Sequence, residues 1–211
     1  MNDFRQRHGF GDYRWVTFIG TFATQYDIDT MLAVCSHFSK NTDVRFAFIG
    51  AGSQVESLKQ KVREAQFDNV EVLDWISHDE IPAAWCMSAI TFFALRPQAL
   101  YRGTIPAKLY EALACGIPVV AAVEGAAAQM ITESGAGVTV PCQDVSGLVA
   151  GIETLLADAD RQGQYRHAGR AYAERQFNPE RVADAYEETL RLAYMSRRSR
   201  SGKSSASDSR R

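Results

Sequence analysis

The stretch GTIPAKLYEALACGIPVVAA, residues 103–122, predicts a helix that is followed directly by a buried strand. Pro106 opens the expected helix and Gly116 lies just past its end, which is the usual asymmetry of helix termini. Residues 118–122 then form a short apolar run, as in a strand that is buried on both faces. A helix joined to such a strand is one unit of an α/β sheet.

The same alternation of helix and strand extends in both directions from this stretch. Five further apolar runs have the length of strands, at residues 15–19, 44–49, 70–73, 90–95 and 137–140. Segments with helical spacing lie between them, at residues 27–40, 54–65, 80–87 and 126–133. This pattern predicts an α/β fold, with a doubly wound, Rossmann-like parallel sheet of about six strands.

Helical segments also close the chain after the last strand. Asp144 is placed to cap one of them, and Asn178 with Pro179 to open the final one. We expect three regions: a lead-in or linker remnant at 1–13, a domain with its C-terminal helices at 14–195, and a disordered basic tail at 196–211.

The composition excludes several classes of protein. The chain has 211 residues, 46% of them apolar and 23% charged, with a net charge of −2, so most of it should bury a core. It has no run of about 18 apolar residues that could cross a membrane, and its charged N-terminus is unlike a secretory signal. Residues 197–211 carry six Lys or Arg against one acid, which leaves the remainder mildly acidic and argues against nucleic-acid binding.

Cysteine and histidine, four of each, are scattered without the spacing of a metal or redox site. We therefore expect reduced, mostly buried thiols in a cytoplasmic protein, and ligand binding that needs no metal. Asp27 and Asp29 have the spacing that can hold a divalent metal on a diphosphate. Both stand where a helix begins, however, and a role at the helix N-terminus explains them better.

The loop before the Pro106 helix is the strongest candidate for a binding site, because ligands of doubly wound sheets bind at the carboxyl ends of the strands. Gly103 and Thr104 precede a helix N-terminus, whose first amides attract anions. Lys108 near the helix start suits a phosphate, and Glu111, on the same face of the helix, suits a sugar hydroxyl. On composition alone, a surface Lys–Glu pair on an ordinary helix is an equal alternative.

Two glycine-containing turns are weaker candidates. Gly20, after the first strand, would let the backbone approach a ligand closely, although a plain strand-to-helix turn explains it better. The residues from Gly50 to Gly52, after the second strand, are similar to the start of a dinucleotide fingerprint, but Val55 stands where its third glycine belongs. A nicotinamide-dependent oxidoreductase is therefore a weakly indicated alternative.

Taken together, these motifs resemble the C-terminal, nucleotide-sugar-binding half of a family-4 (group 1) retaining glycosyltransferase of the GT-B fold. The resemblance covers roughly residues 14–195. Besides the Pro106 helix, it rests on GTF at 20–22, FIGAG at 48–52, NVEV at 69–72, ACGIPVV at 114–120 and ESGAG at 133–137. The form of residues 106–111 is similar to a subgroup that acts in bacterial surface-polysaccharide synthesis.

The family implies transfer of a sugar from a nucleotide-diphosphate sugar, of UDP or GDP type, to an acceptor, with no separate cofactor. In such enzymes a glutamate placed like Glu111 bonds the ribose, a glycine placed like Gly20 faces the diphosphate, and the loop at Ile76 flanks the base. The donor-binding residues implied by the resemblance are Gly20, Thr21, Ile76, Gly103, Thr104, Lys108 and Glu111. No catalytic residue is assigned.

The chain departs from the family pattern at three positions. Gly103 replaces the first glutamate of the family's E-x7-E motif, and Thr21 and Tyr26 replace its diphosphate-binding Arg and Lys. We expect Lys108 and Arg102 to supply part of the missing charge.

The chain is also about half as long as a complete enzyme of this family. The sequence therefore leaves open a donor-binding half that works with a separate N-terminal acceptor-domain subunit, or a truncated or split module without activity of its own. The resemblance places it in the cytoplasm, at most peripherally on the inner face of the membrane. Since the family's C-terminal helix packs on the other half, we expect Val182, Tyr186 and Leu190 to be partly exposed here.

Overall fold

A computed structural model of the chain describes the backbone of residues 2–204 and the side chains of residues 4–196. Residues 205–211 of the expected tail lie outside this range. The structure divides into two compact units, with the boundary between Tyr172 and Ala173, and the first unit contains the whole sheet.

The sheet confirms the predicted fold, because all six strands are present and parallel, in the order β3-β2-β1-β4-β5-β6. The strands are β1 Arg14–Ile19, β2 Val44–Ile49, β3 Val70–Leu73, β4 Ser88–Ala94, β5 Val119–Ala122 and β6 Gly137–Val140. The chain moves outward from β1 to β3, returns to the middle, and moves the other way from β4 to β6. The switch in direction lies between β1 and β4, which is where ligands of such sheets bind.

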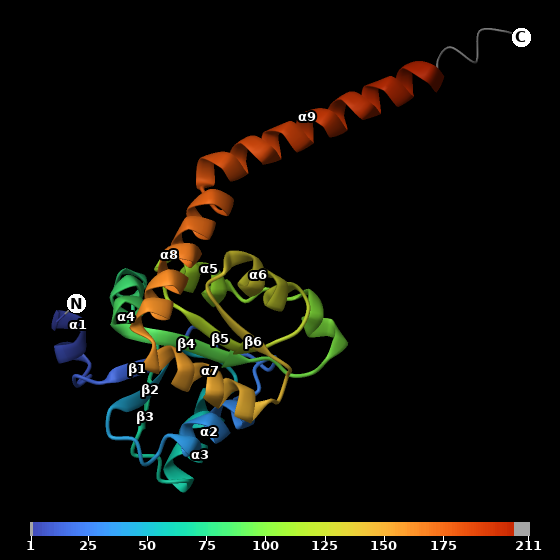
Figure 1. The fold of residues 1–211 in the computed structure, drawn as a ribbon. Helices are drawn as coiled ribbons and strands as arrows, with labels where there is room; N and C mark the ends of the chain where they lie inside the picture. Colours follow the sequence, from blue (N-terminus) through green and yellow to red (C-terminus); the bar gives the residue numbers. More distant parts are fainter. Residues whose placement is uncertain (1, 205–211) are drawn as a thin grey trace, which may run out of the picture. The chain divides into compact units, whose positions relative to one another are not determined.

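Helices cover both faces of the sheet. Figure 1 shows α2, α3 and α7 on one face, with α5 and α6 on the other. The α-helices are α1 Asn2–Arg7, α2 Ile28–His37, α3 Val55–Glu64, α4 Ile81–Met87, α5 Ala107–Ala114, α6 Ala126–Ser134, α7 Val145–Ala157, α8 Ala159–Gln176 and α9 Pro179–Ser204. The described residues also form the short 3-10 helices η1 His78–Glu80 and η2 Ala99–Gly103.

The predicted helix starts are confirmed by their caps. The side chains of Asp27, Asp144 and Asn178 each accept a hydrogen bond from a backbone amide two or three residues further along. These caps satisfy amides that have no partner inside the helix.

Aromatic side chains from strands β2 and β4, on either side of β1, meet at the centre of the core. The rings of Phe46 on β2 and Phe92 on β4 have centroids 5.3 Å apart, and the Phe48 centroid lies 5.8 Å from that of Phe92. All three side chains are fully buried, in the edge-to-face geometry that aromatic rings favour. Because its core is closely packed, the sheet is a rigid support for the loops at its carboxyl edge.

The N-terminal segment differs from the expected lead-in, because residues 2–7 form helix α1. Phe4 and Phe10 are buried, with stacked rings whose centroids are 5.9 Å apart, and Phe10 also contacts Trp15 at the start of β1. Two aromatic residues in a polar segment are too few to show a periodic pattern, so the sequence does not reveal this packing.

The cysteines are all free, but the expectation that they are mostly buried is wrong. Cys35 is buried in α2, whereas Cys86 and Cys115 are exposed and Cys142 is half-buried. The two exposed thiols lie at helix ends, where the amphipathic pattern no longer dictates which side chains face the core.

The second unit, Ala173–Arg211, contains the last turn of α8 and all of α9. Helix α9 continues through Ser204, beyond residue 196 where the sequence predicts a disordered tail. No glycine or proline lies between Glu180 and Ser201 to end it. Val182, Tyr186 and Leu190 are exposed, which confirms that expectation. Within the described residues, no helix combines the length and apolar character needed to cross a membrane.

Candidate functional site

A pocket of about 320 Å³ opens at the carboxyl edge of the sheet, where the strand order reverses. Its walls come from the ends of β1 and β2, the loop after β3, and the first turn of α5. The lining residues are Ile19, Gly20, Thr21, Ala23, Gln25, Tyr26, Ile49, Gly50, Trp75, Ile76, Ile81, Thr104, Ile105, Pro106, Ala107, Lys108 and Glu111.

The N-terminus of α5 forms one wall of this pocket. Pro106 is the N-cap residue, and no side chain from the described residues caps the helix there. At the other end, Gly116 adopts a φ of +65°, and the amide of Ile117 donates to the carbonyl of Ala112, as in a glycine-terminated helix. The uncapped N-terminus directs its partial positive charge at the pocket and suits an anion.

Lys108 lies in the same wall, but its ammonium group is not displayed at the surface. The side chain is only 5% exposed, and Nζ lies 2.8 Å from the ring centroid of Phe18 and 4.0 Å from that of Tyr26. Nζ has no hydrogen-bond partner among the described residues. Burial lowers the pKa of Lys108 well below its ordinary value, and the Glu111 carboxylate opposes this shift in part.

Glu111 lies one turn further along α5 and also lines the pocket. Its Oε2 accepts a hydrogen bond of 3.1 Å from the indole Nε1 of Trp85, whose ring is buried in α4. This bond orients the carboxylate and leaves acceptor positions open. A carboxylate held in this way can accept hydrogen bonds from a polyol ligand.

The turn after β1 closely approaches the turn after β2. Gly50 has a φ of +144°, and a Cβ atom there would lie 2.1 Å from the carbonyl oxygen of Gly20. A Cβ at Gly52 would likewise lie 2.6 Å from the carbonyl oxygen of Phe22. Contact between two turns thus explains the glycines of the Gly50–Gly52 segment, and nothing in this geometry favours the oxidoreductase alternative.

The loop after β3 brings two apolar side chains to the pocket. Ile76 is buried, whereas the ring of Trp75 is 63% exposed at the rim. An exposed indole beside a cavity offers a flat surface on which a planar ligand can stack.

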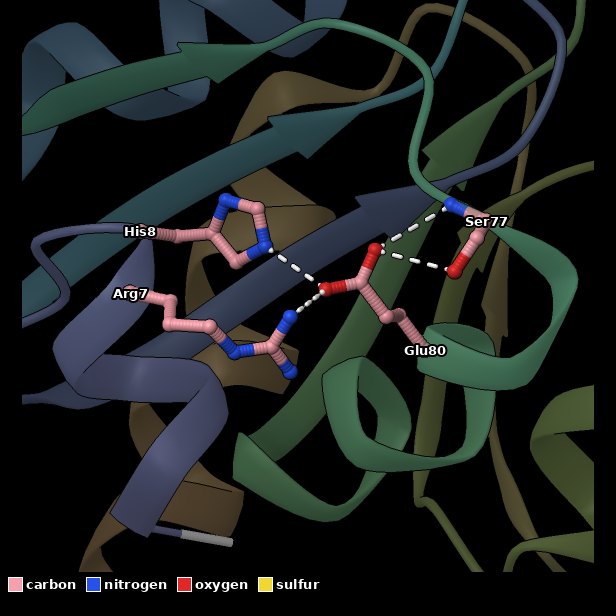
Figure 2. A network of polar contacts seen from close by, with 4 residues as sticks. All are labelled: Arg7, His8, Ser77 and Glu80. Atoms are coloured by element: carbon pink, nitrogen blue, oxygen red, sulfur yellow. Dashed lines mark hydrogen bonds and ion pairs between the residues drawn. The ribbon is translucent and has the colours of Figure 1, made fainter.

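A polar network joins this loop to the N-terminal helix. Figure 2 shows Glu80 of η1 between Ser77 and the end of α1. Glu80 accepts from Arg7 Nη1 at 2.6 Å, and its Oε1 lies 3.1 Å from His8 Nε2. Its other oxygen accepts from the amide and hydroxyl of Ser77. The hydrogen bonds from His8 and Ser77 and the charge of Arg7 lower the pKa of Glu80 to about 2.

Most of the residues singled out from the sequence meet in this one pocket. Six of the seven line it, namely Gly20, Thr21, Ile76, Thr104, Lys108 and Glu111. Gly103 ends η2 and is not among the lining residues. Arg102 does not supply charge here either, because it forms an ion pair of 3.0 Å with Glu124 and lies outside the lining.

Sequence reasoning missed Trp75 and assigned Tyr26 no part in the pocket. A tryptophan two residues past the end of a strand is a usable signal, because ligands of such sheets bind at the carboxyl ends of the strands. The contact between Tyr26 and Lys108 leaves no such signal, since the two residues come from different elements.

The two aspartates at the start of α2 have structural roles. Asp27 accepts hydrogen bonds from the amide and hydroxyl of Thr30, and Asp29 forms an ion pair with Lys61. Within the described residues, no group of three or more His, Cys, Asp or Glu side chains is placed to hold a metal ion.

Comparison with protein families gives a match to "Glycosyl transferases group 1" over residues 1–175. Among curated proteins, the chain is similar to the GDP-mannose-dependent alpha-(1-6)-phosphatidylinositol monomannoside mannosyltransferase of Mycolicibacterium smegmatis. The identity is 26% over 173 residues, which are 80% of this chain and 45% of that protein. The protein of the same description from Mycobacterium tuberculosis H37Rv is 22% identical over 193 residues, 90% of this chain and 50% of that one.

Solved structures have the same fold. Sucrose-phosphate synthase from Thermosynechococcus elongatus superposes with a TM-score of 0.78 at 21% identity, over 93% of this chain and 49% of that one. Anabaena Alr3699/HepE, solved in complex with UDP-glucose, superposes with a TM-score of 0.73 at 20% identity, over 90% of this chain and 52% of that one. The chain spans about half the length of the relatives that it matches.

Proposed function

Because the chain belongs to the group 1 glycosyltransferases, we propose that its pocket binds the nucleotide diphosphate of a sugar donor of UDP or GDP type. One observation carries this proposal: an uncapped helix N-terminus, a lysine and a carboxylate line a single pocket at the switch point of the sheet. A nucleoside diphosphate offers these three groups an anion and a ribose.

The pocket suggests how such a ligand lies in it. The diphosphate belongs against the N-terminus of α5, between the backbone of Gly20 and Lys108, since the open amides and the partial positive charge of the helix lie there. The ribose then reaches Glu111, and the base lies by Ile76 and the exposed ring of Trp75. The sugar extends toward Thr104.

For the reaction, we propose transfer of the sugar with retention of configuration, in the synthesis of a bacterial surface glycan. The curated relatives are described as GDP-mannose-dependent transferases, and Alr3699/HepE was solved with UDP-glucose, so both nucleotides are reasonable donors. We place the protein in the cytoplasm, with at most peripheral contact with the inner face of the membrane.

The matched curated relatives are about twice as long as the aligned region. We propose that an acceptor-binding domain outside these residues completes the enzyme. The second candidate function is a nucleotide-sugar-binding module without activity of its own.

Calorimetric titration of the purified chain with UDP, GDP and NADH tests the proposal. Binding of UDP or GDP, with none of NADH, is the expected result. Binding of NADH alone would overturn the proposal in favour of the oxidoreductase. An assay for sugar release from UDP-glucose and GDP-mannose, made with the acceptor-binding domain present, then separates the candidates, because a module that only binds leaves both intact.

A further inference from the structure

Lys108 presents a problem that the proposed function alone does not solve. An ammonium group has three donors and no acceptor, and it is costly to bury without partners. Nζ of Lys108 nevertheless lies in the wall of the pocket, in a side chain that is 5% exposed, with no hydrogen-bond partner among the described residues.

The surroundings of Nζ are two aromatic rings and a glycine. Phe18 comes from β1 and Tyr26 from the loop before α2, and a Cβ added to Gly20 would lie 3.7 Å from Nζ. Ring faces attract a desolvated cation. That attraction is smaller than the cost of an unpaired buried charge, so a buried lysine usually becomes neutral instead.

Two titratable groups face the amine from the elements packed around it. Glu111, from α5 itself, favours the charged form, while Tyr26 has its own pKa raised to about 12 by burial. Strand β1 contributes the ring of Phe18 and no titratable group to these contacts. Desolvation outweighs Glu111, and the pKa of Lys108 lies well below its ordinary value.

We propose that Lys108 is largely uncharged in the empty pocket and takes up a proton when the diphosphate of a nucleotide sugar binds. The bound phosphate oxygens supply the hydrogen-bond acceptors and the negative charge that the rings lack. The proton comes from solvent and is bound to Nζ, so no covalent bond of the ligand changes. This inference rests on the proposed function, since it requires a diphosphate beside Lys108.

Proton uptake by Lys108 predicts how the affinity for the nucleotide sugar depends on pH. The complex binds more protons than the free protein, so affinity falls as pH rises above the pKa of the free amine. The fall is up to about tenfold for each pH unit, until the amine of the complex also loses its proton. Below the pKa of the free amine the affinity becomes independent of pH, because Lys108 is then charged in both states.

Calorimetry with UDP-glucose and GDP-mannose in two buffers of different ionisation enthalpy measures this uptake directly. Both ligands are diphosphate diesters, which lack the second phosphate ionisation near pH 6 that would confuse the result. The wild-type chain should take up close to one proton. Lys108→Met should take up none, and its affinity should equal the wild-type value at high pH.

A control variant separates Lys108 from other sources of protons. Lys61→Met removes a lysine that is paired with Asp29 away from the pocket. It should retain the uptake. If Lys108→Met does not fold, NMR of lysine labelled at Cε in the wild-type chain gives the same answer. One lysine should then titrate at lower pH than the rest and become protonated on binding.

The outcomes distinguish this inference from the function on which it rests. Binding of a nucleotide sugar without proton uptake, or with unchanged uptake in Lys108→Met, would contradict the inference alone. Failure of both nucleotide sugars to bind would overturn the proposed function and this inference with it.

Discussion

Glu111 is the residue whose substitution best tests the position of the ribose. Its carboxylate lines the pocket and is oriented by the indole of Trp85, so it can accept hydrogen bonds from both ribose hydroxyls. Glu111→Gln keeps an oxygen for Trp85 and removes the charge. We expect UDP or GDP affinity to fall by ~1.5–3 kcal/mol, roughly tenfold to a hundredfold, as for loss of a hydrogen bond to a charged group.

Pyrophosphate serves as the matched ligand for this variant. It lacks ribose, so Glu111→Gln should hardly change its affinity, whereas Lys108→Ala should weaken pyrophosphate and nucleotide alike. Glu133→Gln, on the exposed side of α6 and outside the pocket, is the control substitution. Unchanged nucleotide affinity in a folded Glu111→Gln protein would remove the ribose role from this residue.

The turns after β1 and β2 act as one element, because the two backbones touch at Gly20 and Gly50. A Cβ at Gly50 would lie 2.1 Å from the carbonyl oxygen of Gly20. This oxygen belongs to the backbone, so it cannot move aside as the end of a flexible side chain could. The φ of +144° adds further strain for any other residue. Gly50→Ala should therefore lower the free energy of unfolding by about 1–3 kcal/mol or more, and urea denaturation would measure it.

Gly163 provides the comparison for that substitution. It lies in the exposed interior of α8, where an added Cβ meets nothing within 4 Å. Gly163→Ala should raise the free energy of unfolding by up to ~1 kcal/mol, the usual helix-propensity difference. If both alanine variants were equally stable, the close contact between the two turns would be excluded.

Helix α1 is attached to the pocket loop through Glu80. In the folded protein its pKa is lowered to about 2 from an ordinary value of 4.5, so it stabilises the fold above about pH 4.5. That contribution is lost as pH falls from 4.5 toward 2. Glu80→Gln should loosen α1 at neutral pH, seen as faster hydrogen exchange at the amides of His8 and Phe10, which donate to carbonyls of α1. The difference from wild type should shrink over the same acidic range, and equal exchange at neutral pH would contradict this role.

Helix α9 of the second unit exposes several large apolar side chains to solvent. Six large apolar side chains of α9 are more than 45% exposed: Val182, Tyr186, Leu190, Leu192, Tyr194 and Met195. Exposed apolar patches of this kind favour association. The double variant Tyr186→Lys, Leu190→Glu should bind less of the fluorescent probe ANS and self-associate less in sedimentation experiments.

Glu188→Gln is the control on the same helix, since it changes a polar residue and leaves the apolar surface intact. It should bind ANS as the wild type does. A wild-type chain that neither binds ANS nor self-associates at high concentration would show that this surface is not adhesive.

Local features of the sequence were sufficient to predict the sheet and most helix boundaries. The strand at 44–49 and the helix caps at Asp27 and Asp144 depend on residues within a few positions of one another. The glycine at position 116 likewise reports a local backbone requirement, a φ of +65°. Patterns of this range also place the loops at the carboxyl edge, and so most of the pocket.

Contacts between distant residues decided the rest. Lys108 meets the rings of Phe18 and Tyr26, which precede it by more than 80 residues, and only the folded chain shows that its amine is buried. Arg102 pairs with Glu124, and Glu80 reaches back to α1. Burial, ion pairing and pKa depend on which side chains come into contact in the folded protein. The periodicity of the sequence does not show which distant residues these are. The sequence therefore determined the fold and the location of the pocket, while the tertiary structure determined the charge that the pocket presents.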